Sequence, residues 1–368
     1  MRWPFLSFLS SPADSDDCPI PLWRHPEIGL LDWALNLLFP LIAPLNTSVA
    51  ALRLERGDLS PLIKLRAGLE KHEVPIYERA VQGWEREEVL LKREDGSVLR
   101  LLLHTPPQAA TESREALPTV LFFHGGGYNL GGARDSWGAT LIAELANEGK
   151  APLFAWAGVD YRLAPEAQYP AAAEDGAAAL DALKQEAFFK PRGLSGVVHL
   201  AGVSAGAGLA ATVAADALDR GIDVPTLVLA HPMLDPREAA NLHGSYLKNS
   251  TTGLATVEWL RWSWEVYFPT NLPQLPPRWE RVKPGKLLCT STAGEVSAPR
   301  MRMPRTLVAV ATADPMLDEG LACADALREV GALEDLLYSK GSHSLSLQLD
   351  IKARTDLKEK WAAMLASV

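Results

Sequence analysis

The chain has 368 residues, of which 48% are hydrophobic and 22% charged, the composition of an ordinary globular protein. Its length fits one large α/β domain with additions, or two medium-sized domains. A formal net charge of −9 argues against nucleic acid or an anionic membrane surface as the main partner. Cys18, Cys289 and Cys323 are odd in number and lack metal-ligand spacing, so we expect no disulfide framework, no bound metal and a cytoplasmic location.

The N-terminal region, residues 1–82, has the pattern of helices separated by prolines, and we interpret it as the N-terminal part of a helical cap. Its first residues make a poor secretory signal because Pro4 interrupts a short apolar stretch. The apolar segment 33–45 is shorter than the roughly twenty residues that a membrane span needs. We expect a buried or substrate-facing helix there, with peripheral membrane contact as the alternative.

From Gly83 onward, strands and helices alternate, which is typical of βαβ units on a mostly parallel sheet. We therefore predict an eight-stranded sheet flanked by helices, with its two parts at 83–236 and 301–368. The apolar runs 120–123 and 307–310 indicate central strands that are buried on both faces. Strands are expected at 87–92, 98–104, 119–124, 153–160, 196–203, 226–231, 306–312 and 334–339, and helices at 139–147, 171–188, 205–219, 319–331 and 354–365.

Residues 237–300 interrupt the sheet, and we predict that this insertion packs with residues 1–82 as a cap over the carboxyl edge of the sheet. Ligands bind at that edge in open α/β folds. The aromatic residues of the insertion form the core of the cap or line a hydrophobic pocket, and both interpretations stay open, with Trp259 and Trp262 as the pocket candidates. The aromatic cluster consists of Trp259, Trp262, Trp264, Tyr267 and Phe268.

A first motif, Gly202-Val203-Ser204-Ala205-Gly206, follows one of the predicted strands and precedes an alanine-rich helix. This G-x-S-x-G pattern places the serine on a sharp strand-to-helix turn, and the flanking glycines permit the tight backbone. The sequence therefore predicts that Ser204 is a nucleophile.

A second motif, His124-Gly125-Gly126-Gly127-Tyr128, also follows an apolar strand. A glycine run allows backbone N–H groups to point together at a developing oxyanion. We expect these donors to come from Gly126, Gly127 and Ala205, the residue after the nucleophile. Gly125 is assigned to the turn, and Tyr128 is expected to shape the acyl pocket.

A serine hydroxyl needs a base to take its proton, and the base needs an acid to orient it. His343 follows the last predicted strand, whereas His243 falls in the insertion, so His343 is the predicted base. Asp314 directly follows the strand at 306–312, and the proline after it ends the strand and presents the carboxylate in a loop. Asp318 is expected to cap the helix that begins near residue 319 and is the alternative acid.

Together these motifs resemble the hormone-sensitive-lipase family of α/β hydrolases, which includes carboxylesterases and arylacetamide deacetylases. The segment Tyr161-Arg162-Leu163-Ala164-Pro165-Glu166 resembles the Y-R-L-A-P-E stretch of that family, and Asp314-Pro315-Met316-Leu317-Asp318 resembles its acid motif. The resemblance covers about residues 85–235 and 300–360 and implies an α/β-hydrolase fold with a Ser-His-Asp triad. Arg162 and Glu166 are interpreted as salt-bridged structural residues. Val203 departs from the family, whose elbow commonly carries aspartate before the serine.

The leading functional hypothesis is hydrolysis of a carboxylic ester with an apolar moiety through an acyl-enzyme, without a cofactor. The expected partner is a small apolar ester or a related metabolite, and a homodimer is left open. One alternative uses the same site for cyclisation, dehydration or acyl transfer in specialised metabolism, because a dry aromatic cap excludes water. A minor alternative is a small-molecule receptor resembling the gibberellin-receptor branch of the family, which has lost the histidine that this chain retains as His343.

Overall fold

The structure, a computed structural model, describes residues 25–28, 34, 59–93, 95–107, 116–236, 243–250, 255–268, 303–343 and 345–368. Cys18, Cys289 and nearly all of the apolar segment 33–45 lie outside the described residues. The expectations for them, and the predicted boundaries of the cap, stay predictions.

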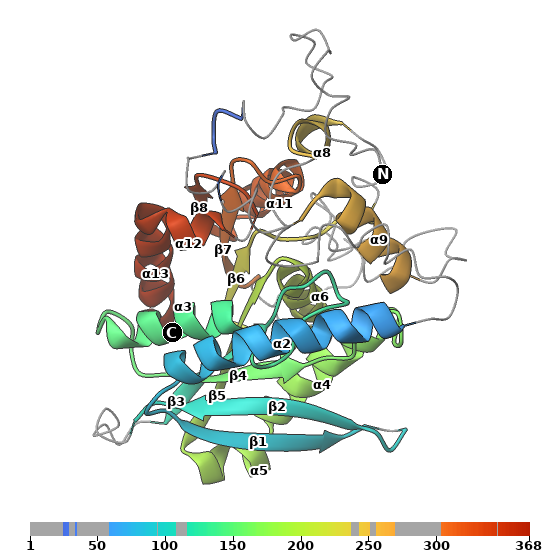
Figure 1. The fold of residues 1–368 in the computed structure, drawn as a ribbon. Coiled ribbons are helices and arrows are strands. Elements are labelled where there is room, and N and C mark those ends of the chain that lie inside the picture. Colours follow the sequence, from blue (N-terminus) through green and yellow to red (C-terminus); the bar gives the residue numbers. More distant parts are fainter. Residues whose placement is uncertain are drawn as a thin grey trace, which may run out of the picture.

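The centre of the molecule is an eight-stranded sheet with the strand order β1-β2-β4-β3-β5-β6-β7-β8 (Figure 1). β2 pairs antiparallel with β1 and β4, and the remaining pairs are parallel. The predicted mostly parallel, eight-stranded sheet is therefore confirmed, with strand ends within a few residues of those expected. The strands are β1 (Glu85–Lys92), β2 (Val98–Thr105), β3 (Leu117–Phe123), β4 (Ala155–Asp160), β5 (Leu194–Val203), β6 (Thr226–Ala230), β7 (Arg305–Ala311) and β8 (Leu333–Ser339).

Helices cover both faces of this sheet, as the continuous apolar runs require. Successive side chains of a strand point to opposite faces, and in β3 Val120 and Phe122 join one buried cluster while Leu121 and Phe123 join the other. The first cluster contains side chains of α2 (Ser60–Ala80), α3 (Ser136–Asn147) and α13 (Ile351–Ala366). The second contains side chains of α4 (Ala171–Lys184), α6 (Ala205–Asp219) and α11 (Leu317–Glu329).

Glycines follow three of the helices, as the sequence predicts, and one predicted helix is divided in two. Gly149, Gly221 and Gly331 follow α3, α6 and α11 with φ of 68°, 69° and 71°, the left-handed conformation that glycine adopts without steric cost. The helix predicted at 171–188 is divided, because Gln185 has an extended backbone between α4 and the short α5 (Glu186–Phe189). Further short elements are η4 (Lys190–Arg192) and α12 (Ser346–Leu349).

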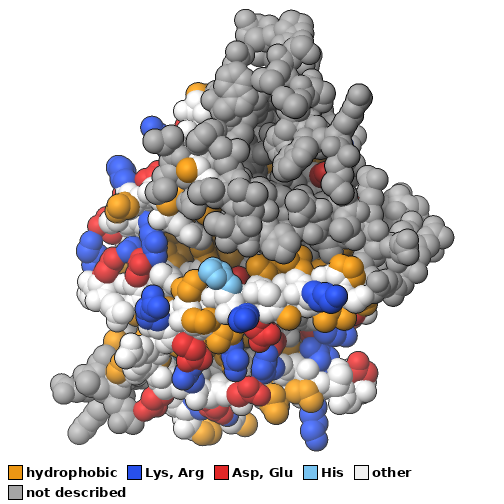
Figure 2. All heavy atoms as spheres, in the orientation of Figure 1, with side chains coloured by type: hydrophobic (Ala, Val, Ile, Leu, Met, Phe, Trp, Pro, Cys, Tyr) orange, Lys and Arg blue, Asp and Glu red, His pale blue; other side chains and the backbone are white. Residues whose placement is uncertain are grey.

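Two described helices, α8 (Gly244–Lys248) and α9 (Val257–Tyr267), belong to the predicted cap insertion. Both lie beyond the sheet in the upper part of Figure 1, with α8 close to α11. Within the described ranges, no helix is long and apolar enough to cross a membrane. On the part of the surface described in Figure 2, basic and acidic side chains are intermixed.

Candidate active site

Ser204 lies on the turn from β5 into α6 with φ 56° and ψ −123°. A non-glycine residue in such a sparsely populated region carries strain of order 1–3 kcal/mol, which the surrounding structure must offset. A Cβ on Gly202 would overlap the carbonyl group of Gly206, and a Cβ on Gly206 would overlap the carbonyl oxygen of Phe123. Both positions therefore require glycine, as the motif predicts.

The segment that follows β6 holds this strained turn in place. The N–H of Ser204 donates to the carbonyl of Ala230 (2.8 Å), and the N–H of Met233 donates to the carbonyl of Ser204 (3.1 Å). Ala205 begins α6, so its N–H lies at the positive end of a fifteen-residue helix. The turn thus presents the serine hydroxyl and a backbone donor at the same point.

The structure brings Ser204, His343 and Asp314 into one hydrogen-bonded chain. His343 Nε2 lies 3.0 Å from Ser204 Oγ, and His343 Nδ1 lies 2.6 Å from Asp314 Oδ2. All three side chains are buried. The geometry allows Nε2 to receive the serine proton while the carboxylate faces the other ring nitrogen, as a Ser-His-acid arrangement requires.

Asp314 is itself held by neighbours on both sides. Its Oδ1 accepts the N–H of Met316 (2.9 Å), and its backbone carbonyl accepts Asn249 Nδ2 (2.8 Å). Asn249 follows α8, and its Oδ1 accepts from His25 Nε2 (2.8 Å). The loop carrying the acid is therefore tied to α8 and, through Asn249, to His25.

The glycine loop turns sharply after β3. Gly126, Gly127 and Tyr128 have φ of 105°, 60° and 63°, and the carbonyl of Gly126 accepts the N–H groups of Asn129 (3.1 Å) and Leu130 (2.9 Å). Asn129 is buried, and its Nδ2 donates to the carbonyl of Gly127 (2.7 Å). The side-chain amide of Asn129 therefore fixes the backbone at the residue expected to supply an oxyanion donor.

Helix α9 lies directly on this loop. Asn129 Nδ2 also donates to Ser263 Oγ of α9 (2.9 Å). A Cβ on Gly127 would lie 2.5 Å from Trp259 Cη2 and 2.6 Å from Ser263 Oγ, so the edge of the Trp259 indole faces Gly127. Only a glycine leaves room for α9 at this position.

The aromatic cluster of α9 packs mainly as a core. Tyr128 stacks on Tyr267 with ring centroids 4.0 Å apart, and Trp264 lies 5.4 Å from the Tyr128 ring. Trp264 also stacks on Phe268. Trp262 is buried as well. For Trp264, Tyr267 and Phe268 the core interpretation therefore holds, while Trp259 occupies a different place beside the glycine loop.

Comparisons with known proteins identify the family to which this fold belongs. The sequence profile of a family described as alpha/beta hydrolase fold matches residues 120–345. The chain belongs to the hormone-sensitive-lipase-like α/β hydrolases. It is 31% identical over 258 residues to an ethyl acetate hydrolase from Pseudomonas putida, a match covering 68% of this chain and 72% of that protein.

Two further relatives indicate both the breadth of the family and the shared fold. The chain is 31% identical over 241 residues to the gibberellin receptor GID1B of Arabidopsis thaliana, spanning 64% of this chain and 61% of the receptor's length. A solved structure of the Pyrobaculum calidifontis esterase is similar with a TM-score of 0.66 and 25% identity, covering 83% of this chain and 92% of that one. The family thus contains proteins named as esterases and proteins named as receptors.

In this α/β hydrolase, Arg162 and Glu166 make the structural salt bridges that were predicted for them. Arg162 pairs with the buried carboxylate of Asp175 (3.0 Å). Glu166 accepts two hydrogen bonds from Arg66 of α2 (2.6 and 2.9 Å), whose guanidinium also donates to the carbonyls of Asn129 (2.8 Å) and Ala164 (2.7 Å). Arg66 therefore joins α2 to the loop that follows the glycine motif.

The prediction that Asp318 caps α11 is wrong. The helix begins at Leu317, its N-cap is Met316, and no side chain caps it. Because α11 starts two residues earlier than expected, Asp318 lies within its first turn and accepts the N–H of Ser245 in α8 (2.7 Å). His243, the histidine that falls in the insertion, is exposed at the N-cap of α8.

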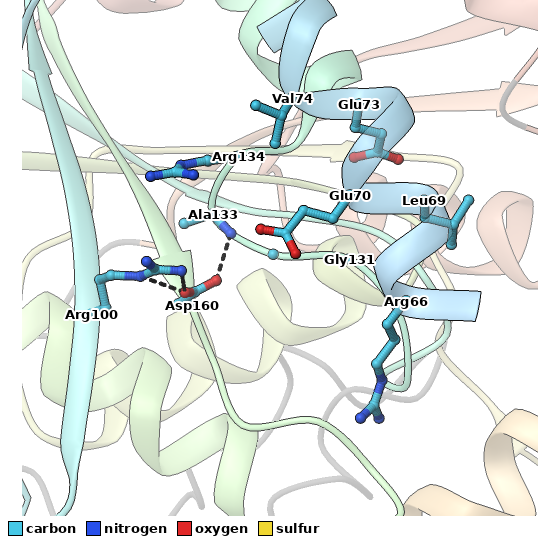
Figure 3. A pocket seen from close by; sticks show the side chains of 11 residues that line it. Arg66, Leu69, Glu70, Glu73, Val74, Arg100, Gly131, Ala133, Arg134 and Asp160 are labelled. Atoms are coloured by element: carbon cyan, nitrogen blue, oxygen red, sulfur yellow. Dashed lines mark hydrogen bonds and ion pairs between the residues drawn. The ribbon is translucent and has the colours of Figure 1, made fainter. Parts of the chain in front are cut away.

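A polar cavity of about 260 Å³ lies between α2 and the residues after the glycine motif (Figure 3). Its lining includes three basic and three acidic side chains, Arg66, Arg100, Arg134, Glu70, Glu73 and Asp160. Arg100 Nε donates to Asp160 Oδ2 (2.7 Å), and Asp160 Oδ1 accepts the N–H of Ala133 (2.7 Å). Neither Ser204, Asp314 nor His343 lines this cavity, so it is separate from the hydrogen-bonded chain. The described residues contain no cluster of His, Cys, Asp and Glu that could hold a metal ion.

Three residues at the site were not predicted: Asn129, Asn249 and His231. Asn129 follows the glycine motif directly, and a polar residue after a turn is its only signal in the sequence. Asn249 lies in the insertion, 65 positions from its partner Asp314, and nothing in the local pattern marks it. His231 directly follows the buried strand β6, where parallel strands present side chains at the carboxyl edge of a sheet.

Proposed function

We propose that this protein is a serine hydrolase that cleaves carboxylic esters with an apolar moiety. The observation that carries the proposal is the buried chain Ser204 Oγ···His343 Nε2 (3.0 Å) and His343 Nδ1···Asp314 Oδ2 (2.6 Å). The similarity to an ethyl acetate hydrolase supports the same reaction class.

In the proposed reaction, His343 Nε2 takes the proton of Ser204 as Oγ attacks the ester carbonyl. The N–H groups of Gly126, Gly127 and Ala205 stabilise the oxyanion of the tetrahedral intermediate. The intermediate collapses when His343 returns the proton to the leaving alcohol, and the acyl group stays on Ser204. Water then repeats the sequence, with His343 as base, and releases the carboxylic acid.

The carboxylate of Asp314 orients His343 and stabilises the imidazolium that forms in each half-reaction. Its own hydrogen bonds, to the N–H of Met316 and through its backbone to Asn249, hold it at the end of β7. Rigid support matters here because a misplacement of about 1 Å in such a site can cost about 10²-fold in rate.

An apolar part of the substrate is proposed to lie against Trp259 and Trp262, with Tyr128 supporting the wall of the acyl pocket. The indole edge of Trp259 faces Gly127, next to the expected oxyanion donors. Tyr128 is fully buried beneath Tyr267, so it supports this wall rather than moving with the substrate. An aromatic surface beside the expected oxyanion donors favours esters with an apolar acyl or alcohol group.

A direct test is turnover of p-nitrophenyl esters of increasing acyl length by the wild type and by Ser204→Ala. We expect hydrolysis by the wild type and a loss of kcat of roughly 10⁶-fold in the variant. Ser195→Ala is the matched control, because Ser195 lies on the same strand and accepts a local N–H from Val197 (3.2 Å). Equal activity of Ser204→Ala and Ser195→Ala would refute the role of Ser204.

The similarity to gibberellin receptors supports a second function, the binding of a small molecule without turnover. A receptor would bind a ligand and leave it chemically unchanged, whereas the proposed enzyme releases an acid. Hydrolysis in H₂¹⁸O separates these cases and also tests the fate of the acyl group. One ¹⁸O atom in the released acid supports hydrolysis, whereas acyl transfer, cyclisation or dehydration would release a product without the label.

A further inference from the structure

A second buried histidine lies beside His343 and has no role in the reaction proposed above. His231 directly follows β6 with φ 47°, and its N–H donates to the carbonyl of Ala309 in β7 (2.7 Å). Its ring centroid lies 5.4 Å from that of His343, with the two planes inclined at 54°. A bulky side chain with positive φ in a buried position is uncommon and marks a constrained site.

The imidazole of His231 belongs to a buried network with two serines. Its Nε2 lies 3.2 Å from Ser346 Oγ and 3.4 Å from Ser339 Oγ. Ser339 Oγ donates to Ser346 Oγ (2.8 Å) and lies 3.2 Å from the carbonyl of Val310. The network therefore connects the ends of β6, β7 and β8 to the first residue of α12.

Ser346 anchors one end of the short loop that carries His343. The N–H of Ser346 donates to the carbonyl of Ser342 (3.0 Å), so the loop folds back on itself around His343. At its other end, the carbonyl of Gly341 accepts the N–H of Ala313, the residue before Asp314 (2.9 Å). The loop is thus held to β7 before His343 and to His231 after it.

We infer that His231 is a positioning residue that, through Ser346, fixes the loop carrying His343 and so sets the distance from His343 to Ser204. The inference rests on the proposed function, because it assigns to His231 an effect on the reaction of Ser204. It differs from a general packing role in that the loss of the hydrogen bond should slow the chemical step more than it weakens substrate binding.

The chemistry of imidazole suits this role. Burial, together with the neighbouring His343, lowers the pKa of His231 to about 3, so the ring is uncharged at neutral pH. An uncharged neighbour does not oppose the positive charge that forms on His343 during the reaction. A lysine or arginine at position 231 would place a cation beside the imidazolium and raise its energy.

The test compares kcat and KM of His231→Leu, His231→Gln and Ser346→Ala. Leucine keeps an apolar volume but removes the ring nitrogen, and we expect kcat to fall by roughly tenfold or more with KM within about twofold. Ser346→Ala should lower kcat by a similar factor. His231→Gln keeps a side-chain amide that can reach Ser346 and should recover most of the activity.

The double variant His231→Leu/Ser346→Ala separates positioning from two unrelated defects. If both residues act through one hydrogen bond, the double variant is no slower than the slower single variant. His199→Leu is the matched control, because His199 is also a buried histidine bound to a hydroxyl, Thr226 Oγ1 (2.8 Å), but lies in β5 away from the loop. It should leave kcat unchanged even where it lowers the thermal midpoint.

The inference would be overturned if the fold losses of kcat in the two single variants multiplied in the double variant. An unchanged kcat in folded His231→Leu and Ser346→Ala would overturn it as well. If His231→Leu does not fold, Ser346→Ala decides the question alone, because an unchanged kcat in folded Ser346→Ala overturns the inference. A wild-type protein that neither hydrolyses esters nor reacts at Ser204 refutes the proposed function itself. An active wild type with inert substitutions at positions 231 and 346 refutes only the role of His231.

Discussion

Replacing Gly127 by alanine tests whether α9 packs on the glycine loop as tightly as the structure indicates. Gly127 has φ 60°, and an added Cβ would lie 2.5 Å from Trp259 Cη2 and 2.6 Å from Ser263 Oγ. A left-handed conformation costs a residue with a Cβ about 1–2 kcal/mol. Forcing an extra carbon into a packed contact adds about 1–3 kcal/mol.

The expected loss of stability for Gly127→Ala is therefore about 2–5 kcal/mol, the sum of these two effects. Activity should fall further than stability explains, because a displaced backbone N–H no longer meets the oxyanion and one such donor is worth about 10²–10³-fold in kcat. Thermal unfolding and steady-state hydrolysis of a p-nitrophenyl ester measure the two effects separately.

Gly149→Ala is the matched control. Gly149 has φ 68°, close to that of Gly127, but a Cβ there has no atom within 4 Å. This variant should show the backbone strain alone, about 1–2 kcal/mol, with unchanged kcat. Adding Trp259→Leu to Gly127→Ala should return part of the lost stability, because it removes one of the two overlapping groups.

Equal losses of stability in Gly127→Ala and Gly149→Ala, together with an unchanged kcat in Gly127→Ala, would refute tight packing of α9 on the glycine loop. That outcome would mean that α9 does not rest on the glycine loop in solution. If the stability losses of Gly127→Ala and Trp259→Leu simply added in the double variant, that result would also argue against the contact, because residues in contact are expected to couple.

Two further substitutions test the acid and the polar cavity. Asp314→Asn should lower kcat by about 10⁴-fold with little change in the thermal midpoint, because it disturbs the orientation of His343; a loss below tenfold would exclude Asp314 as the acid. Burial and the nearby Asp135 raise the pKa of Glu73 to about 8, so the folded protein retains a proton that the unfolded chain has lost between about pH 4.5 and 8. The contribution of Glu73 to the free energy of unfolding is fully present below pH 4.5. It decreases as the pH rises from 4.5 to 8, by at most about 1.4 kcal/mol per pH unit. Glu73→Gln should therefore unfold at an increasingly higher temperature than wild type from pH 5 to 8, and an equal pH dependence of Glu73→Gln, Glu70→Gln and wild type would contradict this.

Much of the fold was predictable because its signals are local. The runs 120–123 and 307–310 are apolar without alternation, since helices cover both faces of the sheet, and this pattern alone indicates central parallel strands. The glycines of the elbow are predictable for a similar reason, because the turn leaves no space for a Cβ at Gly202 or Gly206.

The supporting contacts were not predictable, because they join residues far apart in the chain. Arg66 reaches Glu166, one hundred positions away, and Asn249 reaches Asp314 across most of the insertion. Asp318 was misassigned because helix ends are set by backbone geometry as well as by side-chain type, and α11 begins earlier than its sequence indicates. His231 carries no motif, and its relation to His343 emerges only when β6 and β8 are placed in one sheet.

We propose Ser204 as the nucleophile of this protein and His343 as the base that activates it. Intact-mass measurement after treatment with a fluorophosphonate tests this proposal most directly, because the reagent reacts with activated serines and needs no knowledge of the natural ester. We expect one adduct on the wild type, mapped to Ser204, no adduct on Ser204→Ala, and much slower labelling of His343→Ala. An unlabelled wild type, or equal labelling of wild type and Ser204→Ala, would contradict the account.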